Sequence, residues 1–563
     1  MGDHPERFEI DRRRFIQLLG LGSLGIPILA SCSSGPTPAP STTGAAASST
    51  TAAASSTTAP TGPAKGGQLV IVTGDGVGGT FASSASLGPH TVAHRQFLWT
   101  LYRETNDYTI APGLAEDYEV SPDGLTHTFR LRDGLTFHDG SPLTAREVAE
   151  NLEMYFDPAS PLRDEAGIYL QVILFFGFPT DETKFVAEAV DDLTVVVRAP
   201  EPRPDLRGAM TNLYIYNPRV VEAHLDTYGT DVDLLAQVGS GPFRVTAFDP
   251  GKAVEFERVD GFFEEANLDR LRLQLVPDAA ARFLALKSGD AQAAYALSNP
   301  DWNAVLADPS TWSTHVGQLD TNVFLSLNLD QEPAWADERV RKAVAYATNR
   351  EAYVEAFWGQ GLAEPAGFIA LAPGVDPRAL PDLAPPPYDP DEARRLLEEA
   401  GYGDGLELTV VDPAAFTNVP ELKAMLEAMA ADLAQVGIDL QINLVDPGSW
   451  IPATAENDCS VVPYGNGVGV EAAVMSLYFN RSPRQYATPT TDEWRAAVVA
   501  ARTALDPAES AEHLRGVLEE AAEAMAGIPI AFSGVGIASR ADVHDLGVYH
   551  AGIASHHTAW IEA

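Results

Sequence analysis

Two hydrophobic periodicities alternate along the chain from residue 66 onward, and this alternation limits the possible folds most strongly. Runs with strand-like spacing are found at 126–132, 194–198, 243–248, 253–259, 270–276, 323–329, 406–411 and 438–445. Amphipathic runs with helical spacing are found at 144–156, 337–349, 390–401 and 419–437. No internal repeat of fixed period is visible. The pattern therefore predicts an α/β fold.

The length and charge of the chain narrow this further. About 500 residues follow Gly66, more than one hydrophobic core usually supports, so several lobes are expected. The formal net charge of -41 argues against a nucleic-acid partner, because a polyanion would be repelled. A well-solvated surface explains this acidity more simply than a specific cation-binding role.

Residues 1–31 have the features of a twin-arginine lipoprotein signal peptide. Arg12 and Arg13 precede a short apolar run that is too short to cross a bilayer, which needs about 20 residues. The run ends in Leu-Ala-Ser-Cys, which resembles a bacterial lipobox, so Cys32 is the expected site of lipid attachment. The alternative is a disordered basic tail that contains both motifs by chance.

Residues 32–65 follow the lipobox as a tether. Beyond Cys32 they consist almost wholly of Ser, Thr, Ala, Pro and Gly, which provide too little apolar surface to offset the entropy of ordering. The other cysteine, Cys459, would have no partner in the processed chain. A large core rather than disulfides is expected to stabilise this exported protein.

The stretch QLVIVTGDGVGGT, at 68–80, matches the spacing G-x-G-x-x-G of dinucleotide-binding loops. Such a loop should open at once into a helix and be followed by an acidic residue after a second strand. Here Gly88-Pro89 interrupts any such helix, and Glu104 follows the helix-like stretch 94–102. The glycines instead suit a close approach of bare backbone to a solute.

Six blocks, taken in chain order, resemble the solute-binding proteins of family 5, which serve ABC importers of peptides, nickel and related solutes. The first block is AEDYEVSPDGLTHTFRLRDGLTFHDGSPLTAREVAENLEMYF, and the second begins with the turn GSGP. The blocks lie at 115–156, 239–263, 282–294, 323–361, 388–402 and 433–450. Each also has a structural explanation, since turn residues between period-2 strands shape hairpins.

The resemblance implies a two-lobed periplasmic-binding-protein fold, type II-like, with the ligand cleft between the lobes. Lobe I would comprise 66–320 and 531–563, with a smaller domain inserted at about 111–235, and lobe II would comprise 321–530. The stretch 68–80 would then supply the first strand of lobe I and a loop entering the cleft. Closure on a peptide or peptide-like solute would present it to an ABC permease.

This implied function places a monomer at the extracytoplasmic face of the bacterial cell membrane, held by its lipid anchor and using no cofactor. Two alternatives stay open. The same scaffold could bind a non-peptide solute, such as an oligosaccharide or a nickel complex, or act as a surface sensor without a permease. The chain contains no G-x-S-x-G, H-E-x-x-H or P-loop motif, so nothing in it favours an enzyme or a catalytic residue.

The expected ligand-binding residues are glycines, aromatic residues and polar residues of loops that would face the cleft. They are Gly78, Gly79, Phe81, Trp358, Phe368, Trp450, Tyr464, Asn466 and Glu471. Core packing explains each aromatic residue equally well, and a surface turn explains Tyr464 and Asn466 equally well. In 461–480, where peptide-binding relatives carry an aspartate for the α-amino group, Glu471 is the only carboxylate. An ordinary α-amino dipeptide therefore fits poorly.

Three further sets of residues could suggest sites, and a structural role is favoured for each. His138 is expected to be a hydrogen-bonded turn histidine rather than a ligand or base. Arg339, Arg341 and Arg350 are expected to cap and pair rather than bind an anion. The C-terminal histidines fit no compact metal motif and are expected to form a solvated tail; they are His544, His550, His556 and His557.

Overall fold

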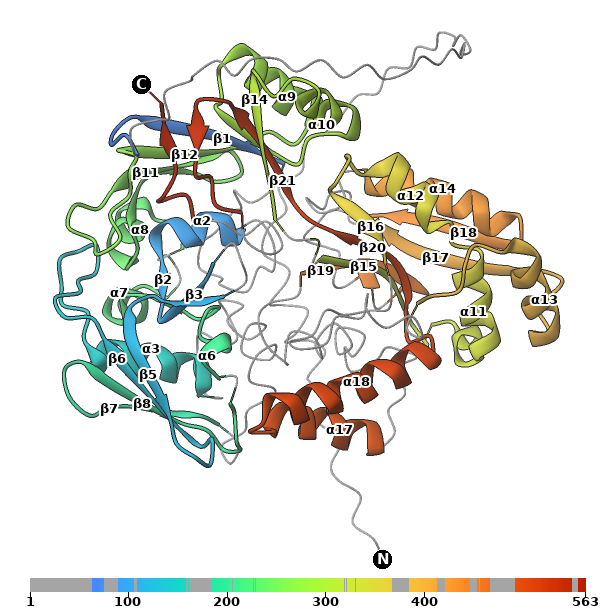
Figure 1. Cartoon of the computed structure of the whole chain (residues 1–563), viewed down its shortest axis with the longest axis horizontal. Coiled ribbons are helices and arrows are strands. Elements are labelled where there is room, and N and C mark those ends of the chain that lie inside the picture. Colours follow the sequence, from blue (N-terminus) through green and yellow to red (C-terminus); the bar gives the residue numbers. More distant parts are fainter. Residues whose placement is uncertain are drawn as a thin grey trace, which may run out of the picture.

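Two large β-sheets organise the protein (Figure 1). The computed structural model describes residues 63–74, 90–105, 109–157, 160, 184–204, 206–225, 227, 229–317, 319, 321–329, 331–366, 384–412, 421–445, 453–454, 456–465, 492–548 and 555–562. Among them, no helix combines the length and apolar character needed to span a membrane.

The first sheet has seven strands in the order β10-β11-β12-β1-β13-β21-β14. Its central strand β1 runs parallel to β12 and β13, whereas the outer pairs are antiparallel. The bounds are β1 (Gln68–Thr73), β10 (Phe243–Asp249), β11 (Ala253–Arg258), β12 (Arg270–Leu275), β13 (Ala293–Tyr295), β14 (Trp312–Val316) and β21 (Gly536–Arg540).

Alternation along β1 buries both faces of this sheet, as a central strand requires. Leu69 and Ile71 belong to one core cluster with α2 (His90–Phe97). Val72 belongs to a second cluster, together with side chains of α9 (Ala279–Ser288) and α10 (Asn299–Leu306). The prediction of a first strand at this position is confirmed.

A smaller four-stranded sheet, in the order β5-β6-β8-β7, lies within the segment expected to form an inserted domain. Its strands are β5 (Ala115–Val120), β6 (Thr126–Leu131), β7 (Val186–Ala189) and β8 (Thr194–Arg198). Helix α3 (Ala145–Phe156) packs on it and begins at a capping box formed by Thr144 and Glu147. The region also contains these described short elements: β2 (Trp99–Thr100), β3 (Tyr102–Glu104), β4 (Ile110–Pro112), α6 (Leu206–Ala209), β9 (Tyr214–Ile215), α7 (Pro218–Ala223) and α8 (Val232–Val238).

The second large sheet has six strands in the order β16-β20-β15-β19-β17-β18. They are β15 (Thr321–Leu327), β16 (Ala363–Pro365), β17 (Leu406–Asp412), β18 (Ile438–Leu444), β19 (Cys459–Gly465) and β20 (Ile528–Ser533). The helical elements of this part, among the described residues, are η1 (Pro333–Ala336), α11 (Glu338–Tyr346), α12 (Arg350–Phe357), α13 (Pro390–Ala400), α14 (Leu422–Ala434), α17 (Asp492–Thr503) and α18 (Pro507–Glu523).

In the order of the described strands, the chain passes from one large sheet to the other at two places. The first crossing joins β14 to β15, and the second joins β20 directly to β21. The expected lobe boundary at 530 falls inside β20, because the strand continues to Ser533 before the chain reaches the first sheet at Gly536. The second crossing therefore lies at 534–535.

One expected helix is shorter than its periodicity indicated. The stretch 94–102 looked helix-like, but α2 ends at Phe97 and the chain continues as β2 and β3. Turn amides at 240 and 241 donate to the carbonyl oxygen of Phe97. These tertiary hydrogen bonds redirect the chain, and Glu104 consequently lies in a strand.

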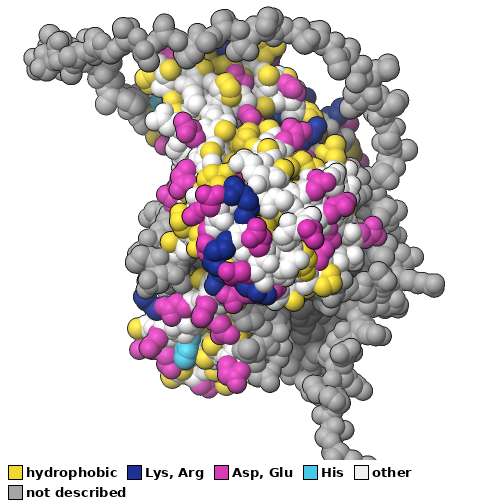
Figure 2. Space-filling view, turned by 90° about the vertical axis from the view of Figure 1, so that its right-hand side faces the viewer, with side chains coloured by type: hydrophobic (Ala, Val, Ile, Leu, Met, Phe, Trp, Pro, Cys, Tyr) yellow, Lys and Arg dark blue, Asp and Glu magenta, His cyan; other side chains and the backbone are white. Residues whose placement is uncertain are grey.

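Charged side chains on the outer helices of the second sheet are paired. Figure 2 shows the basic side chains of this face standing among acidic ones. On α11, Lys342 pairs with Glu338, and on α13, Arg395 pairs with Glu392 and Glu399. This mixed surface agrees with a solvated acidic protein rather than a polyanion-binding one.

Candidate ligand-binding site

The turn at 239–242 fixes the strand where the candidate site begins. Two amides of this turn donate to the carbonyl oxygen of Phe97 at 3.0 and 2.9 Å. Ser240 Oγ accepts a hydrogen bond from the Trp99 amide at 3.1 Å and donates one to the carbonyl oxygen of Ile215 at 2.6 Å. A single hydroxyl thus ties β2 to β9 and positions Trp99.

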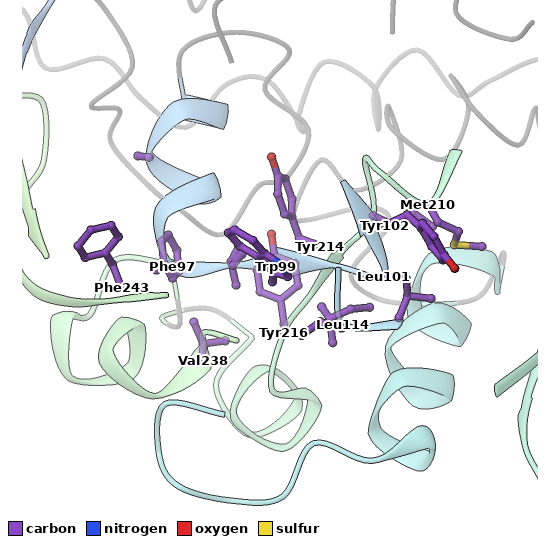
Figure 3. Packing of buried hydrophobic residues seen from close by; sticks show 14 of the residues in the cluster. Phe97, Trp99, Leu101, Tyr102, Leu114, Met210, Tyr214, Tyr216, Val238 and Phe243 are labelled. Carbon is purple, nitrogen blue, oxygen red and sulfur yellow. The ribbon is translucent and has the colours of Figure 1, made fainter. Parts of the chain in front are cut away.

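A cavity of about 20 Å³ lies beside β2. That volume holds about one water molecule, so it is too small for a whole solute and admits at most one small polar end-group. Its walls are formed by Arg95, Leu98, Trp99, Thr100, Arg103, Glu104, Tyr214 and Ser555. Figure 3 shows the Trp99 and Tyr214 side chains near one another, with the Tyr214 hydroxyl pointing away from Leu114 and Val238.

A buried pair of opposite charges contributes to the cavity wall. Arg95 Nη2 lies 4.0 Å from Glu104 Oε2, and the two side chains are 6% and 1% exposed. Thr211 Oγ1 lies 3.5 Å from Glu104 Oε1. Burial raises the pKa of Tyr214, although the nearby positive charge of Arg95 opposes this shift. The Tyr214 hydroxyl therefore stays protonated and can donate or accept.

The indole Nε1 of Trp99 is buried without a hydrogen-bond partner in the part of the chain that the structure describes. The Tyr214 hydroxyl, by contrast, interacts with Arg95. Buried polar groups of native proteins are nearly always paired. Together with a cation, a carboxylate and a tyrosine hydroxyl, this indole N–H makes the wall suited to a polar solute carrying both charges.

A tryptophan wedge lies where the chain crosses between the two large sheets. Trp302 of α10 is fully buried, and its Nε1 donates to the carbonyl oxygen of Gln360 at 3.1 Å. A Cβ on Gly359 would lie 2.2 Å from the Trp302 ring, and one on Gly536 would lie 2.6 Å from it. Glycine at both positions therefore lets the ring fill the crossing.

Most of the expected ligand-binding residues lie outside the described residues. This holds for Gly78, Gly79, Phe81, Phe368, Trp450, Asn466 and Glu471, and also for Arg12, Arg13 and Cys32 of the leader. Their roles stay predictions.

Two expected ligand-binding residues are described. Tyr464 lies in β19, opposite Asn322 of β15, so the alternative of a surface turn is wrong at this position. Trp358 is 3% exposed and belongs to the core cluster of the second sheet. Its burial favours the core-packing alternative.

His138 is a hydrogen-bonded turn histidine, as expected. Its Nε2 donates to the carbonyl oxygen of Gly241 at 2.9 Å. Burial lowers the pKa of His138 to about 4, so the imidazole is neutral at pH 7. A Cβ on Gly239 would lie 2.3 Å from its Nδ1, which explains why this turn carries a glycine there.

The three arginines after β15 hold structure rather than an anion. Arg339 pairs with Asp337 on the surface. Arg341 donates to the carbonyl oxygens of Trp335 and Ala524, the latter at 2.8 Å. Arg350 donates to four carbonyl oxygens: those of Ala345, Thr348, Pro386 and Pro529. The expectation of a structural role is confirmed, but surface pairing holds only for Arg339, because Arg341 and Arg350 are 7% and 4% exposed and bind backbone carbonyl oxygens.

The expectation of a solvated C-terminal tail is wrong for two of its four histidines, while His550 lies outside the described residues. His556 and His557 are 0% and 3% exposed. His556 Nε2 lies 3.1 Å from the Tyr295 hydroxyl, and His557 Nε2 lies 3.3 Å from a carboxylate oxygen of Glu264. The apolar and hydrogen-bonding surface of the first sheet binds this segment, which also supplies Ser555 to the cavity wall.

The remaining C-terminal histidine belongs to a short strand pair. His544 lies in β22 (Val543–His544), which pairs with β23 (Trp560–Ile561), and its ring stacks on Trp560. Within the described ranges, no three His, Cys, Asp or Glu side chains gather in a way that could hold a metal ion.

Comparison with known proteins gives one family. Residues 109–487 match the model of bacterial extracellular solute-binding proteins, family 5, middle region. The glutathione-binding protein GsiB of Pectobacterium atrosepticum is 30% identical over 395 residues, which cover 66% of this chain and 69% of that protein. Other proteins of that name are matched over 61% and 65% of their lengths.

Solved structures show the same fold. The dipeptide-binding protein from Pseudoalteromonas sp. SM9913, in complex with Met-Leu, superposes with a TM-score of 0.76 at 19% identity and covers 88% of this chain and 100% of that one. The periplasmic binding protein DppA from Helicobacter pylori, in complex with the peptide STSA, gives 0.74 at 20% identity, covering 89% and 99%. At these identities the likeness concerns the fold, which is the two-lobed one.

Proposed function

This chain belongs to the bacterial extracellular solute-binding proteins of family 5, and on that premise we propose that it captures a small peptide-like solute and delivers it to an ABC permease by lobe closure. The family consists of transport proteins, and we infer that no reaction accompanies binding. Lobe I would comprise 66–320 and 534–563, including the inserted domain at about 111–235, and lobe II would comprise 321–533. The two chain crossings support this division, since they can act as a hinge.

The proposed ligand class rests on the side chains that form the cavity wall at β2. Arg95 and Glu104 offer one positive and one negative charge, while Trp99 offers a ring with an unpartnered indole N–H and Tyr214 offers a hydroxyl. A zwitterionic peptide-like solute complements such a wall. Glutathione, which has two carboxylates and one ammonium group, is the first probe because relatives at 30% identity carry that name.

Native mass spectrometry of protein purified without refolding tests the ligand class directly. Thermal shift then measures affinity for glutathione and for dipeptides, since ligand at 100 times its Kd adds about 2.7 kcal/mol of stability. Arg95→Gln and Glu104→Gln should each weaken binding by about tenfold or more, as expected for lost hydrogen bonds to charged groups. Arg244→Gln, on a surface pair of β10, is the matched control. A co-purified sugar or metal complex, or unchanged affinity in both variants, would refute the peptide proposal.

We further propose that the protein is held at the extracytoplasmic membrane face by lipid on Cys32, after export directed by Arg12 and Arg13. The tether to residue 65 would let the lobes reach a permease while anchored, since about thirty such residues span roughly 30 Å. Cys32→Ala should release the protein from the membrane fraction. Continued attachment of that variant would remove Cys32 as the lipid site.

A further inference from the structure

We propose that the α17–α18 helical pair and the inserted domain form a latch that stabilises the closed lobes, and thereby sets solute affinity. The latch consists of an ion pair between Arg502 and Glu201 and an apolar contact between Leu505 and Gly124. The inference rests on the proposed function, because it requires lobes that open and close.

The ion pair joins the inserted domain of lobe I to a helix of lobe II. Arg502 lies in α17, and Glu201 lies in the segment that follows β8 of the small sheet. Their side chains are 21% and 37% exposed. Solvent still reaches both groups, so the pair can part and re-form without leaving a fully buried charge.

The apolar contact lies next to the ion pair. Leu505, between α17 and α18, is 49% exposed, and it reaches the hairpin turn that joins β5 to β6. A Cβ on Gly124 would lie 2.7 Å from Leu505 Cδ2 and 3.3 Å from Pro202 Cβ. The turn therefore presents bare backbone to Leu505. The glycine also has a φ of +69°, which other residues rarely adopt.

Each side of the latch is held to its own lobe by hydrogen bonds. On one side, the Gly124 carbonyl oxygen accepts the Arg203 amide at 2.9 Å and lies 3.1 Å from His127 Nε2. On the other side, Arg341 Nε donates to the carbonyl oxygen of Ala524, at the end of α18, at 2.8 Å. Helix α18 then leads directly into β20 of the second sheet. Relative motion of the two lobes must therefore change the contacts of the latch.

The latch lies away from the hinge. Figure 1 shows α17 and α18 at the bottom of the view, beside the inserted domain. The link between β20 and β21 lies higher in the same view, near its middle. Rotation about the crossings moves this end furthest, whereas the Trp302 contacts stay close to the pivot. Opening therefore separates Arg502 from Glu201 and Leu505 from Gly124. Because apparent affinity scales with the closed fraction, the latch contributes to binding without touching solute.

The test uses solute-free full-length protein and reads the closed population in two ways. Small-angle X-ray scattering measures the radius of gyration. Carbodiimide coupling of an Arg502→Lys variant to Glu201, mapped by mass spectrometry, measures contact across the latch. Neither measurement needs a solute or a permease, so the latch can fail while the proposed transport function stands, and the reverse.

The expected effects are modest and specific. Arg502→Glu should lower the closed-to-open ratio by about two- to fivefold, and the charge swap Arg502→Glu with Glu201→Arg should restore it. In the coupling variant, adding Leu505→Ser should reduce the yield by about fivefold. Arg198→Glu, which breaks an ion pair inside the small sheet with side chains 51% and 50% exposed, is the matched control. For Leu505 the control is Leu444→Ser, since Leu444 is 57% exposed on β18.

Three results would overturn the latch. The first is coupling between positions 201 and 502 at background level. The second is an unchanged radius of gyration in Arg502→Glu, and the third is a swapped variant that stays as open as the single one.

Discussion

Acidification should loosen the docked C-terminal segment, residues 555–562, through one buried histidine. His556 is 0% exposed, and its Nε2 lies 3.1 Å from the Tyr295 hydroxyl. The His556 amide donates to Gln96 Oε1 at 2.9 Å. This histidine therefore couples the segment to both β13 and α2, and its charge state matters for docking.

Burial lowers the pKa of His556 to about 3 from an ordinary value of 6.5, with smaller contributions from His315 and His557. In the released segment the imidazole takes up a proton near pH 6.5, whereas the docked form excludes the proton until about pH 3. Docking is therefore fully favoured above pH 6.5 and weakens as the pH falls toward 3. Each pH unit in this window costs about 1.4 kcal/mol, so the step from pH 6.5 to 5 removes about 2 kcal/mol.

Hydrogen exchange measures this free energy locally, without assuming that the whole chain unfolds in one step. The reporter amides are those of His556 and of Asn267, which donates to the His557 carbonyl oxygen at 2.9 Å. Exchange at pH 7.0, 6.0 and 5.0, corrected for intrinsic rates, gives the opening free energy in each condition. The comparison is with His556→Gln, whose amide can reach Tyr295 but cannot be protonated.

The wild type should lose about 2 kcal/mol more opening free energy than His556→Gln between pH 7 and 5, since almost all of the loss falls below pH 6.5. The difference between the two profiles removes titrations that both proteins share. Parallel profiles would refute the reasoning, because they would mean that the buried imidazole does not resist protonation. A steeper profile in the variant would reverse the sign and refute it as well.

Three substitutions test the packing that positions the lobes. Trp302→Ala should cost about 3 to 5 kcal/mol of unfolding free energy, measured by urea denaturation, because it empties the crossing; a cost below 1 kcal/mol would contradict the wedge. Arg350→Met should cost about 3 kcal/mol or more by leaving buried carbonyl oxygens unpaired, and near-wild-type stability would show that water replaces the guanidinium. Gly239→Ala should lower the melting temperature by forcing His138 away, whereas an unchanged transition would mean that the turn can relax.

The sequence predicted the strands whose patterns are local. Runs such as TVVVR form β8 at the expected residues, because period-2 alternation and flanking turns decide them within a few positions. The three-residue strand β13 was not predicted, since Ala293–Tyr295 is too short to show a period. The end of α2 was missed because hydrogen bonds from a turn more than a hundred residues later decide it.

The candidate site could not be predicted from periodicity for a related reason. Arg95 and Glu104 come from one stretch of the chain, whereas Tyr214 and Ser555 come from two distant ones, and only the folded chain brings them to one cavity. The available signal was the turn GSGP, whose Ser240 ties β2 to β9 and so marks where the wall is built. The GSGP turn, which was expected only to shape a hairpin, thus also positions Trp99.

The two lobes are in contact at the hinge, through Trp302, and at the latch. These two contacts differ in strength, and the difference determines how closure can work. At the hinge, Trp302 is fully buried against two glycines. Replacing this side chain by a small one would cost several kcal/mol, because it would leave a cavity. At the latch, a partly exposed ion pair contributes about 1 kcal/mol or less, and half-buried Leu505 contributes a similar amount. Their sum biases the lobes by roughly thirtyfold at most, well below the approximately ten-thousandfold that a complete switch requires. The solute must therefore supply most of the closing free energy, as a transport receptor needs if a permease is to distinguish loaded from empty protein.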